Sequence, residues 1–175
     1  MGFLYQDERF ADLQLLRYRL NGFDELSLRQ KILIYYLSKA TIFGRDITFD
    51  QYGKYNLRIR KMLEVIYCDA TIPHDTDDFR ALEVYLKRIW FSNGIYHHYG
   101  CEKFKPVFSA VYLQDILKKV DAQKLPLKAG ESVEEMCREL FPVIFDEDIL
   151  PKRVNKADGE DLIQTSACHF YEGVS

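Results

Sequence analysis

Residues 76–94 read TDDFRALEVYLKRIWFSNG, and they carry the clearest structural signal in the chain. The apolar side chains recur at intervals of three and four residues, which places them on one face of a helix. Thr76 or Asp77 is suited to cap the first turn, and the final Ser-Asn-Gly run is typical of a helix end. The stretch therefore predicts an amphipathic helix that buries one face in a core.

Similar spacing on both sides of this stretch predicts further helices. Ser27 is expected to begin one of them, and Gly44 has the position of the glycine that follows a helix end. An irregular connection is expected over residues 45–55, and strand-like windows are limited to residues 47–49 and 143–145. The six further helices are expected at residues 7–20, 27–43, 56–67, 109–120, 132–141 and 158–170.

These elements predict a mainly α fold: one compact helical domain over residues 1–175, with about seven helices and at most short strands. A length of 175 residues and a mass of 20.7 kDa suit a single domain. Nine glycines and five prolines are few for a loop-rich all-β protein. The side chains expected in the core include Leu33, Leu37, Leu63, Leu86, Ile89 and Trp90.

Composition and charge exclude several classes of function. The net charge is -3, and the basic run Arg58, Arg60 and Lys61 is followed by Glu64, which is typical of a solvated helix face and not of a nucleic-acid site. No apolar run approaches the ~18 residues of a membrane helix. The first twenty residues are too acidic for a signal peptide, and four scattered cysteines indicate free thiols, so a cytoplasmic location is expected.

Motifs for common catalytic chemistry are missing from the sequence. None of the four histidines is followed by glutamate, and no two lie four residues apart, so the chain has no zincin motif. A P-loop, a G-x-G-x-x-G fingerprint and a G-x-S-x-G elbow are also missing. A metal site that combines His97 or His98 with Cys101, or with the distant Cys168-His169 pair, remains an alternative, although a closed site needs four converging ligands.

One segment has no regular period. Residues 95–107 read IYHHYGCEKFKPV, are dense in aromatic and histidine side chains, and lie between two expected helices. Loops held by rigid elements often carry binding residues, which favours a functional role. The alternative is that Tyr96, Tyr99 and Phe104 only cover the core.

Five segments, in order, resemble the bacterial form of the dipeptidyl peptidase III family of zinc metallopeptidases. Together they cover most of the chain, and the string Asn93-Gly94, His97-His98-Tyr99 and Lys103-Phe104 is the most specific part. The segments are FADLQLLRY (10–18), LSLRQKILIYYLSKATIFGRDITFDQ (26–51), YNLRIRKMLEVIY (55–67), EVYLKRIWFSNGIYHHYGCEKFKPVF (83–108) and KRVNKADGEDLIQTSACHFYEGVS (152–175).

The resemblance implies a longer parent enzyme with two lobes around a wide cleft, which removes dipeptides from the N-termini of short peptides. The zinc-bearing His-Glu-x-x-Gly-His helix of the family belongs to the other lobe, and its sequence is not found here. The chain is therefore expected to be an N-terminal lobe segment that supplies scaffold but no catalytic residue and no cofactor of its own. The residues that the resemblance places near the interlobe cleft are Asn93, Gly94, His97, His98, Tyr99, Lys103 and Phe104.

The expected partners follow from the same resemblance. They are the catalytic lobe that is missing here and the short peptides on which the parent acts. Cys101 and Tyr96 depart from the family pattern, which often has an acidic or polar residue and a histidine at those positions. Two rival hypotheses are a stand-alone, non-catalytic helical interaction module and a small metal- or ligand-binding enzyme built on the loop. A homodimer through the edge left by truncation is also expected, by way of Ile163, Phe170, Tyr171 or Tyr99.

Overall fold

The computed structural model describes residues 2–152 and 154–166. Their contacts gather into two units, an N-terminal unit that extends to Ile47 and a C-terminal unit that begins at Thr48. The two units differ in their pattern of burial.

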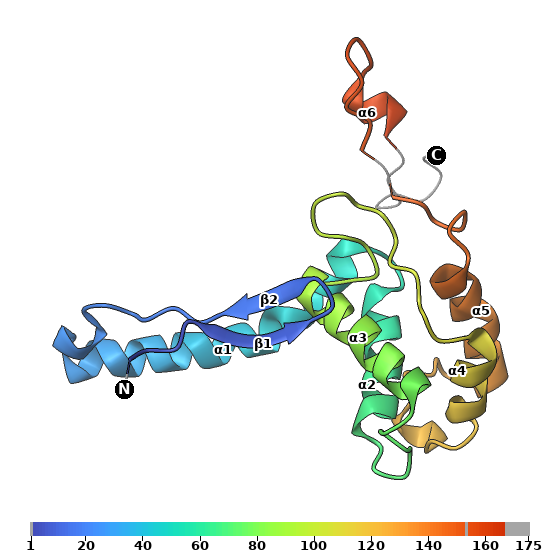
Figure 1. Ribbon diagram of the computed structural model, residues 1–175, viewed down its shortest axis with the longest axis horizontal. Helices are drawn as coiled ribbons and strands as arrows, with labels where there is room; N and C mark the ends of the chain where they lie inside the picture. The colour runs from blue at the N-terminus through green and yellow to red at the C-terminus, as the bar shows by residue number, and fades with distance from the viewer. Residues whose placement is uncertain (1, 153, 167–175) are drawn as a thin grey trace. The chain divides into compact units, whose positions relative to one another are not determined.

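Helices dominate the described part of the chain (Figure 1), with 52% of its residues helical and five helices of eight or more residues. The predicted mainly α fold with short strands is thus confirmed. The predicted count of about seven helices is wrong, because the first is a hairpin and the last is a single described turn. The elements are β1 (Gln6–Phe10), β2 (Leu13–Leu16), η1 (Phe23–Glu25), α1 (Leu28–Tyr52), α2 (Asn56–Cys68), α3 (Asp77–Ser92), α4 (Ala110–Leu117), η2 (Ala122–Lys124), α5 (Val133–Phe145) and α6 (Leu162–Thr165).

A two-stranded β-hairpin replaces the first predicted helix. β1 and β2 pair antiparallel, with Phe10 opposite Leu13, and Ala11 takes a left-handed φ of 47° at the turn. The Arg17 guanidinium lies 2.9 Å from the Asp7 carboxylate, which joins the two sides of the hairpin. Apolar residues three and four apart also arise when two short strands flank a tight turn, so the periodicity of this window does not distinguish the two structures.

α1 continues for 25 residues, through the predicted end at Gly44. A glycine inside a helix costs only about 1 kcal/mol relative to alanine, which weakens a helix without ending it. Beyond the glycine, Phe49 is 4% exposed, and the Arg60 Cζ atom lies 4.4 Å from the centroid of its ring. This packing stabilises the last turns of α1. The predicted connection at 45–55 is therefore reduced to residues 53–55, and the strand window at 47–49 is wrong.

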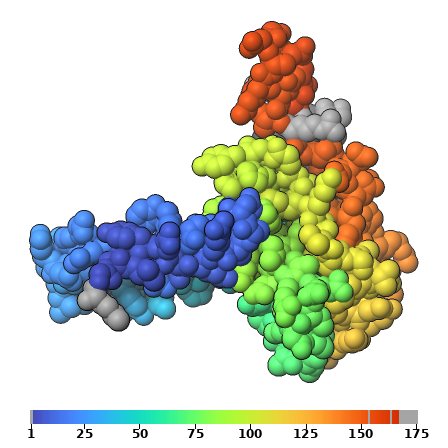
Figure 2. Space-filling model, in the orientation of Figure 1, coloured from blue at the N-terminus to red at the C-terminus, as the bar shows by residue number. Residues whose placement is uncertain are grey.

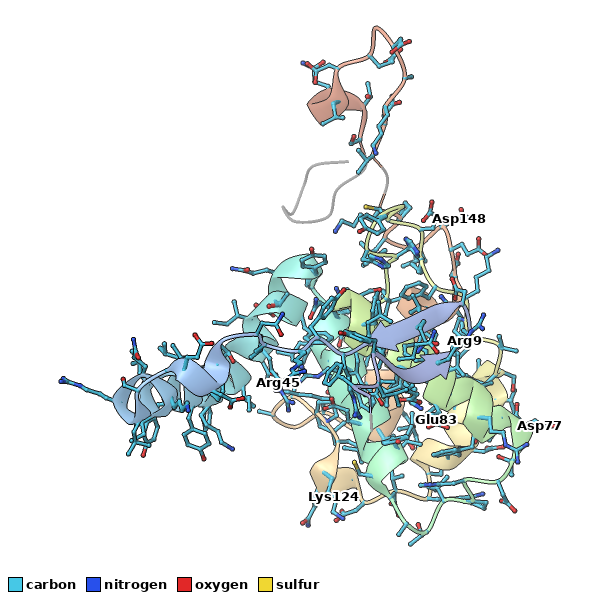
Figure 3. The ribbon with its side chains drawn as sticks, turned by 60° about the vertical axis from the view of Figure 1, so that its left-hand side comes forward. Arg9, Arg45, Asp77, Glu83, Lys124 and Asp148 are labelled. Atoms are coloured by element: carbon cyan, nitrogen blue, oxygen red, sulfur yellow. The ribbon has the colours of Figure 1, made fainter. Side chains whose placement is uncertain are left out.

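The remainder of α1 is exposed. Leu33 and Leu37, which were predicted to lie in the core, are 58% and 57% exposed. Side chains stand out on several sides of this helix around Arg45 (Figure 3), and the hairpin of the same unit leaves them in contact with solvent. Within the residues that the structure describes, no helix, α1 included, combines the length and apolar character that a membrane crossing requires.

The core of the C-terminal unit lies among α2, α3, α4 and α5, with α2 packed on α3 and α4 on α5 (Figure 1). Leu63, Leu86 and Ile89 are fully buried, as predicted. Trp90 is 36% exposed, because its indole N–H donates a 2.8 Å hydrogen bond to the Glu64 carboxylate at the surface. The predicted inward position of Trp90 is therefore wrong, although its helix is confirmed.

Three helices of this unit begin at side-chain caps that the sequence indicates. The Thr76, Ser109 and Ser132 hydroxyls each accept a hydrogen bond from a backbone N–H in the first turn of the helix. Ser132 and Glu135 form the predicted capping box, in which each side chain accepts from the other's backbone N–H. Local sequence therefore determines where these helices start.

The end of α5 is decided by packing. The sequence predicts a helix that stops at Phe141, because Pro142 removes a backbone donor and a strand window follows at 143–145. In the structure the helix runs through the proline to Phe145. Val143 and Ile144 are only 4% and 1% exposed, so their burial offsets the lost hydrogen bond.

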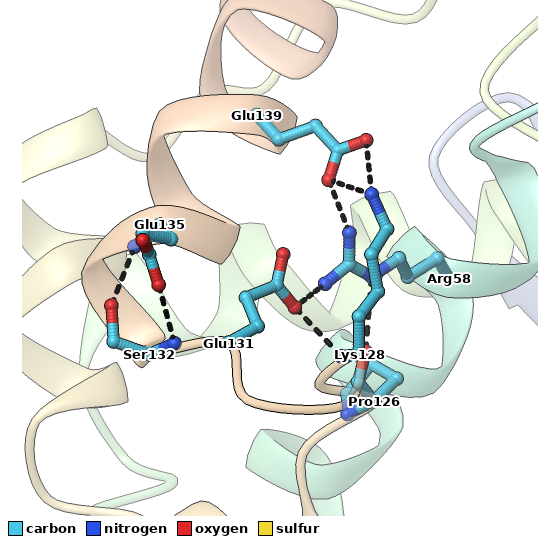
Figure 4. Close-up of polar contacts among 7 residues, drawn as sticks. All are labelled: Arg58, Pro126, Lys128, Glu131, Ser132, Glu135 and Glu139. Carbon is cyan, nitrogen blue, oxygen red and sulfur yellow. Dashed lines mark hydrogen bonds and ion pairs between the residues drawn. The ribbon is translucent and has the colours of Figure 1, made fainter.

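An ion network fastens α2 to α5 and to the segment before α5 (Figure 4). The Arg58 guanidinium donates to the Pro126 carbonyl at 2.9 Å, to Glu139 at 2.5 Å and to Glu131. Lys128 also donates to Glu139, at 2.6 Å. Hydrogen bonds from Lys128 and Arg58 lower the pKa of Glu139. Arg58 is 14% exposed and therefore tethers elements of the core, instead of lying on the solvated face that the sequence suggests.

Candidate functional site

The candidate site is the loop of residues 93–104, which begins where α3 ends. Asn93 adopts a left-handed φ of 56°, and the backbone of Gly94 lies against the side chain of Asn56. The Asn56 side-chain carbonyl accepts a 3.2 Å hydrogen bond from the N–H of Ile95, and Asn56 is 1% exposed. This buried amide fixes the start of the loop to the first turn of α2.

Backbone hydrogen bonds close the 93–104 loop on itself. The N–H of Phe104 donates to the Ile95 carbonyl at 2.8 Å, and the N–H of His97 donates to the Glu102 carbonyl at 2.7 Å. The N–H of Cys101 donates to the His97 carbonyl at 3.0 Å. The residues between His97 and Glu102 therefore form a short tip on a hairpin-like base.

Two side chains fasten this base to the segment that follows α5. Tyr96 and Lys103 face each other in an isolated antiparallel bridge. The Tyr96 hydroxyl donates to the Leu150 carbonyl at 2.9 Å, and Lys103 Nζ donates to the carbonyls of Asp146, at 2.8 Å, and Ile149. The tip is thus held on a support that includes residues about fifty positions further along the chain.

Burial shapes the electrostatics of both anchors. Desolvation lowers the pKa of Lys103, and the nearby carboxylates of Asp146, Glu147 and Asp148 act against this shift. Desolvation raises the pKa of the Tyr96 hydroxyl well above its usual range. Tyr96 therefore stays neutral at physiological pH and remains a hydrogen-bond donor.

The two adjacent histidines stack on each other. Their ring centroids are 4.5 Å apart, and His98 also contacts the Tyr99 ring at 4.4 Å. His97 Nδ1 accepts hydrogen bonds from the N–H groups of Tyr99 and Gly100, at 3.2 and 3.1 Å. Because a neutral imidazole has one accepting and one donating nitrogen, we assign the proton of His97 to Nε2. His98 Nδ1 lies 3.5 Å from the Ser92 hydroxyl.

The structure brings the predicted site residues into one loop but gives them different environments. In Figure 2 the loop, in yellow-green, forms part of the surface of its unit. Tyr99 is 83% exposed and His97, His98 and Lys103 are half-buried, whereas Tyr96 and Phe104 are 4% and 9% exposed. The interpretation that aromatic residues cover the core is therefore confirmed for Tyr96 and Phe104 and wrong for Tyr99.

A cleft of about 560 Å³ adjoins the loop. Its walls combine basic and acidic side chains, and Lys105 pairs with Glu147 at 2.5 Å. The lining residues are Gly100, Glu102, Lys103, Lys105, Glu147, Asp148, Pro151, Lys152 and Val154.

Several residues that line the cleft or support the loop could not be predicted from the sequence. Asn56 looks like an ordinary first residue of a helix, and Glu147 and Lys152 lie in a segment without a recognisable motif. Their roles depend on contacts between residues about forty to fifty positions apart, for which a single sequence carries no signal. The sequence indicates the loop itself, by its density of aromatic and histidine residues and by the resemblance, but not the residues that support it.

The metal-site and dimer hypotheses can be compared with the described residues. In residues 2–152 and 154–166, no group of three or more His, Cys, Asp or Glu side chains is placed to hold a metal ion. Of the side chains expected at a dimer edge, Tyr99 is exposed. The side chain of Ile163 lies outside the described part of the chain, as do Phe170, Tyr171 and the possible metal ligands Cys168 and His169.

Comparison with known proteins adds no assignment. Neither a protein-family model nor a curated protein matches the chain.

Proposed function

We propose that the chain is the N-terminal lobe segment of a zinc exopeptidase similar to dipeptidyl peptidase III, and that its 93–104 loop forms one wall of the peptide cleft. The observation that carries the proposal is the coincidence of two features. The most specific part of the resemblance, from Asn93 to Phe104, falls on a loop that is pinned at its base and presents His97, His98 and Tyr99 at the surface.

The chemistry of the loop suits peptide binding. With Nδ1 engaged by two backbone N–H groups, His97 Nε2–H is available to donate to a peptide carbonyl. The exposed Tyr99 ring offers an apolar surface with a polar tip, which suits peptide side chains. In this proposal the loop binds and orients substrate, while the other lobe supplies zinc, its ligands and the base.

The reading frame of the gene provides the first test. The proposal expects a His-Glu-x-x-Gly-His sequence in the same polypeptide, C-terminal to residue 175. A stop codon close to Ser175 would contradict it and favour the interaction-module alternative.

Kinetics of the full gene product provide the second test. It is expected to release dipeptides from a dipeptidyl arylamide in a chelator-sensitive reaction. His97→Ala and Tyr99→Ala should raise KM several-fold and change kcat less, because these residues bind substrate without taking part in bond cleavage. Val107→Ala is the matched control, since Val107 is 88% exposed just outside the loop. Equal KM values in all variants would exclude the loop from the cleft.

The isolated 175-residue chain gives a further comparison. It is expected to purify without stoichiometric zinc and to release no dipeptide, because a catalytic zinc needs three placed ligands and a base. Stoichiometric zinc with chelator-sensitive turnover would overturn the proposal and support the loop enzyme built on His97, His98 and Cys101.

A second candidate function has separate support. The exposed apolar side chains of α1 are typical of a surface that binds another protein. They favour a non-catalytic helical interaction module if the gene lacks the zinc-binding sequence.

A further inference from the structure

The part of α1 in the N-terminal unit exposes an unusual amount of apolar surface. Phe43 is 88% exposed, and Tyr36 is 65% exposed. Most soluble monomers distribute such side chains singly, whereas here they follow one another along a single helix. The exposed large apolar residues of this segment are Leu28, Ile32, Leu33, Ile34, Tyr35, Tyr36, Leu37, Ile42, Phe43 and Ile47.

One stripe on this helix has a regular repeat. Leu33, Tyr36, Ala40, Phe43 and Ile47 follow at intervals of three, four, three and four residues, which is the a and d pattern of a coiled coil. Neighbouring stripes are interrupted by charged or polar side chains. We name these five residues the α1 seam.

We propose that the α1 seam pairs with the α1 seam of a second copy of this chain, in an antiparallel helix pair. This inference goes beyond the proposed function, because it concerns a different surface. In the proposed register, Ala40 faces Phe43 of the second copy and Tyr36 faces Ile47, whereas Leu33 lies opposite Asp50, outside the paired layers. The small alanine side chain leaves room for the phenylalanine ring, so the layer of Ala40 and Phe43 combines complementary volumes.

Charge favours the same register. It places Lys39 beside Asp46 of the second copy, and the two-fold symmetry of the pair produces this contact twice. Within one chain, Lys39 Nζ lies 5.6 Å from the Tyr35 ring centroid, and Asp46 lies 3.9 Å from Arg45. A parallel pair would instead bring Lys39 near the other chain's Gly44, which offers no charge.

The available area is sufficient for association. The exposed parts of Tyr36, Leu37, Phe43 and Ile47 amount to roughly 600 Å² per copy, given the size of such side chains. Covering this surface on two copies brings the buried area close to the ~1,200 Å² at which specific interfaces begin. A second copy is therefore a large enough partner.

Sedimentation equilibrium of the 175-residue chain tests the proposal. The wild type should associate to a dimer at micromolar concentrations. Phe43→Asp should raise the dissociation constant at least tenfold, because it places a carboxylate in the seam. The monomer should keep its stability, since Phe43 makes little contact with its own chain. Val107→Asp is the control, because Val107 is equally exposed, at 88%, but lies outside α1.

A charge exchange tests the register. Lys39→Glu and Asp46→Lys should each weaken the dimer about tenfold, and the double variant should restore it, because the two charges trade places. Failure of the double variant to recover would overturn the antiparallel register.

A wild-type chain that stays monomeric to roughly 100 μM would overturn the proposal itself, whether α1 is covered by its own chain or by another protein. None of these measurements depends on peptidase activity. Failure here is therefore distinguishable from failure of the proposed function.

Discussion

α1 and α3 are both rich in apolar residues, yet α3 buries them and most of α1 leaves them exposed. The buried side chains of α3, which include Phe79, Leu82, Leu86 and Ile89, share one face of the helix and are at most 2% exposed. The apolar side chains of α1 surround the helix, and up to Ile47 those of Leu and Ile are 38–74% exposed. Apolar content alone therefore does not predict burial; the arrangement of that content around the helix decides how much one neighbour can cover.

The largest expected contrast comes from matched leucines. Leu86→Ala should lower the free energy of unfolding by about 3 kcal/mol, because it opens a cavity at a position that is 0% exposed. Leu37→Ala on α1, at 57% exposure, should change it by less than about 1 kcal/mol. Urea denaturation of dilute protein measures both. An equal loss in the two variants would mean that α1 is covered in solution.

Matched glycines should shift stability in opposite directions. A methyl group at Gly94 would overlap the buried amide of Asn56, so Gly94→Ala should cost about 2 kcal/mol. Gly44→Ala meets nothing within 4 Å inside α1 and should add about 0.5–1 kcal/mol. Thermal unfolding followed by circular dichroism tests the pair. A neutral Gly94→Ala would show that the start of the 93–104 loop is loosely held.

Two carboxylate substitutions compare the ion network of the C-terminal unit with the exposed ion pair of the hairpin. Glu139→Gln weakens the Arg58 network and should cost about 1–2 kcal/mol at pH 7, whereas Asp7→Asn in the exposed hairpin pair should cost less than about 0.5 kcal/mol. Because the folded protein lowers the pKa of Glu139, this stabilisation is present above the ordinary value of 4.5 and is lost as the pH falls below it. Denaturation curves from pH 7 to pH 3 should therefore converge for wild type and Glu139→Gln. Curves that stay parallel would contradict this account.

The smallest expected effect concerns an unsatisfied hydroxyl group on the buried face of α3. The Tyr85 hydroxyl is buried and has no hydrogen-bond partner among the described residues. Tyr85→Phe should therefore stabilise the protein by about 1 kcal/mol. Burial raises the Tyr85 pKa, so wild type should lose stability as the pH rises above 10, and the variant should lose less. Tyr18→Phe, at 77% exposure, is the control and should change nothing.

Gly44, which lies inside α1 instead of at its end, shows the limit of what local sequence pattern predicts about this fold. A glycine after an apolar run is a common helix end, but burial of Phe49 further along offsets its cost. The hairpin of β1 and β2 shows the same limit. Its paired residues Phe10 and Leu13 lie three positions apart, which is also the spacing of neighbours on one face of a helix. In the candidate site, the position of the loop was predictable from its histidines and aromatics, whereas the anchoring role of Asn56 was not.

Sequence by itself determined the mainly α class, the capped starts of α3, α4 and α5, and the break after α3 at Asn93. These features depend on side chains within one or two turns of each other, which a single sequence records directly. Tertiary structure alone decided the hairpin, the length of α1, the exposure of Leu33 and the support beneath the 93–104 loop. The hairpin pairs near neighbours whose spacing fits a helix equally well, so the pattern cannot distinguish the two structures. The other features depend on whether a segment distant in sequence covers an apolar side chain or pairs with a polar one, and a single sequence does not show which segments meet.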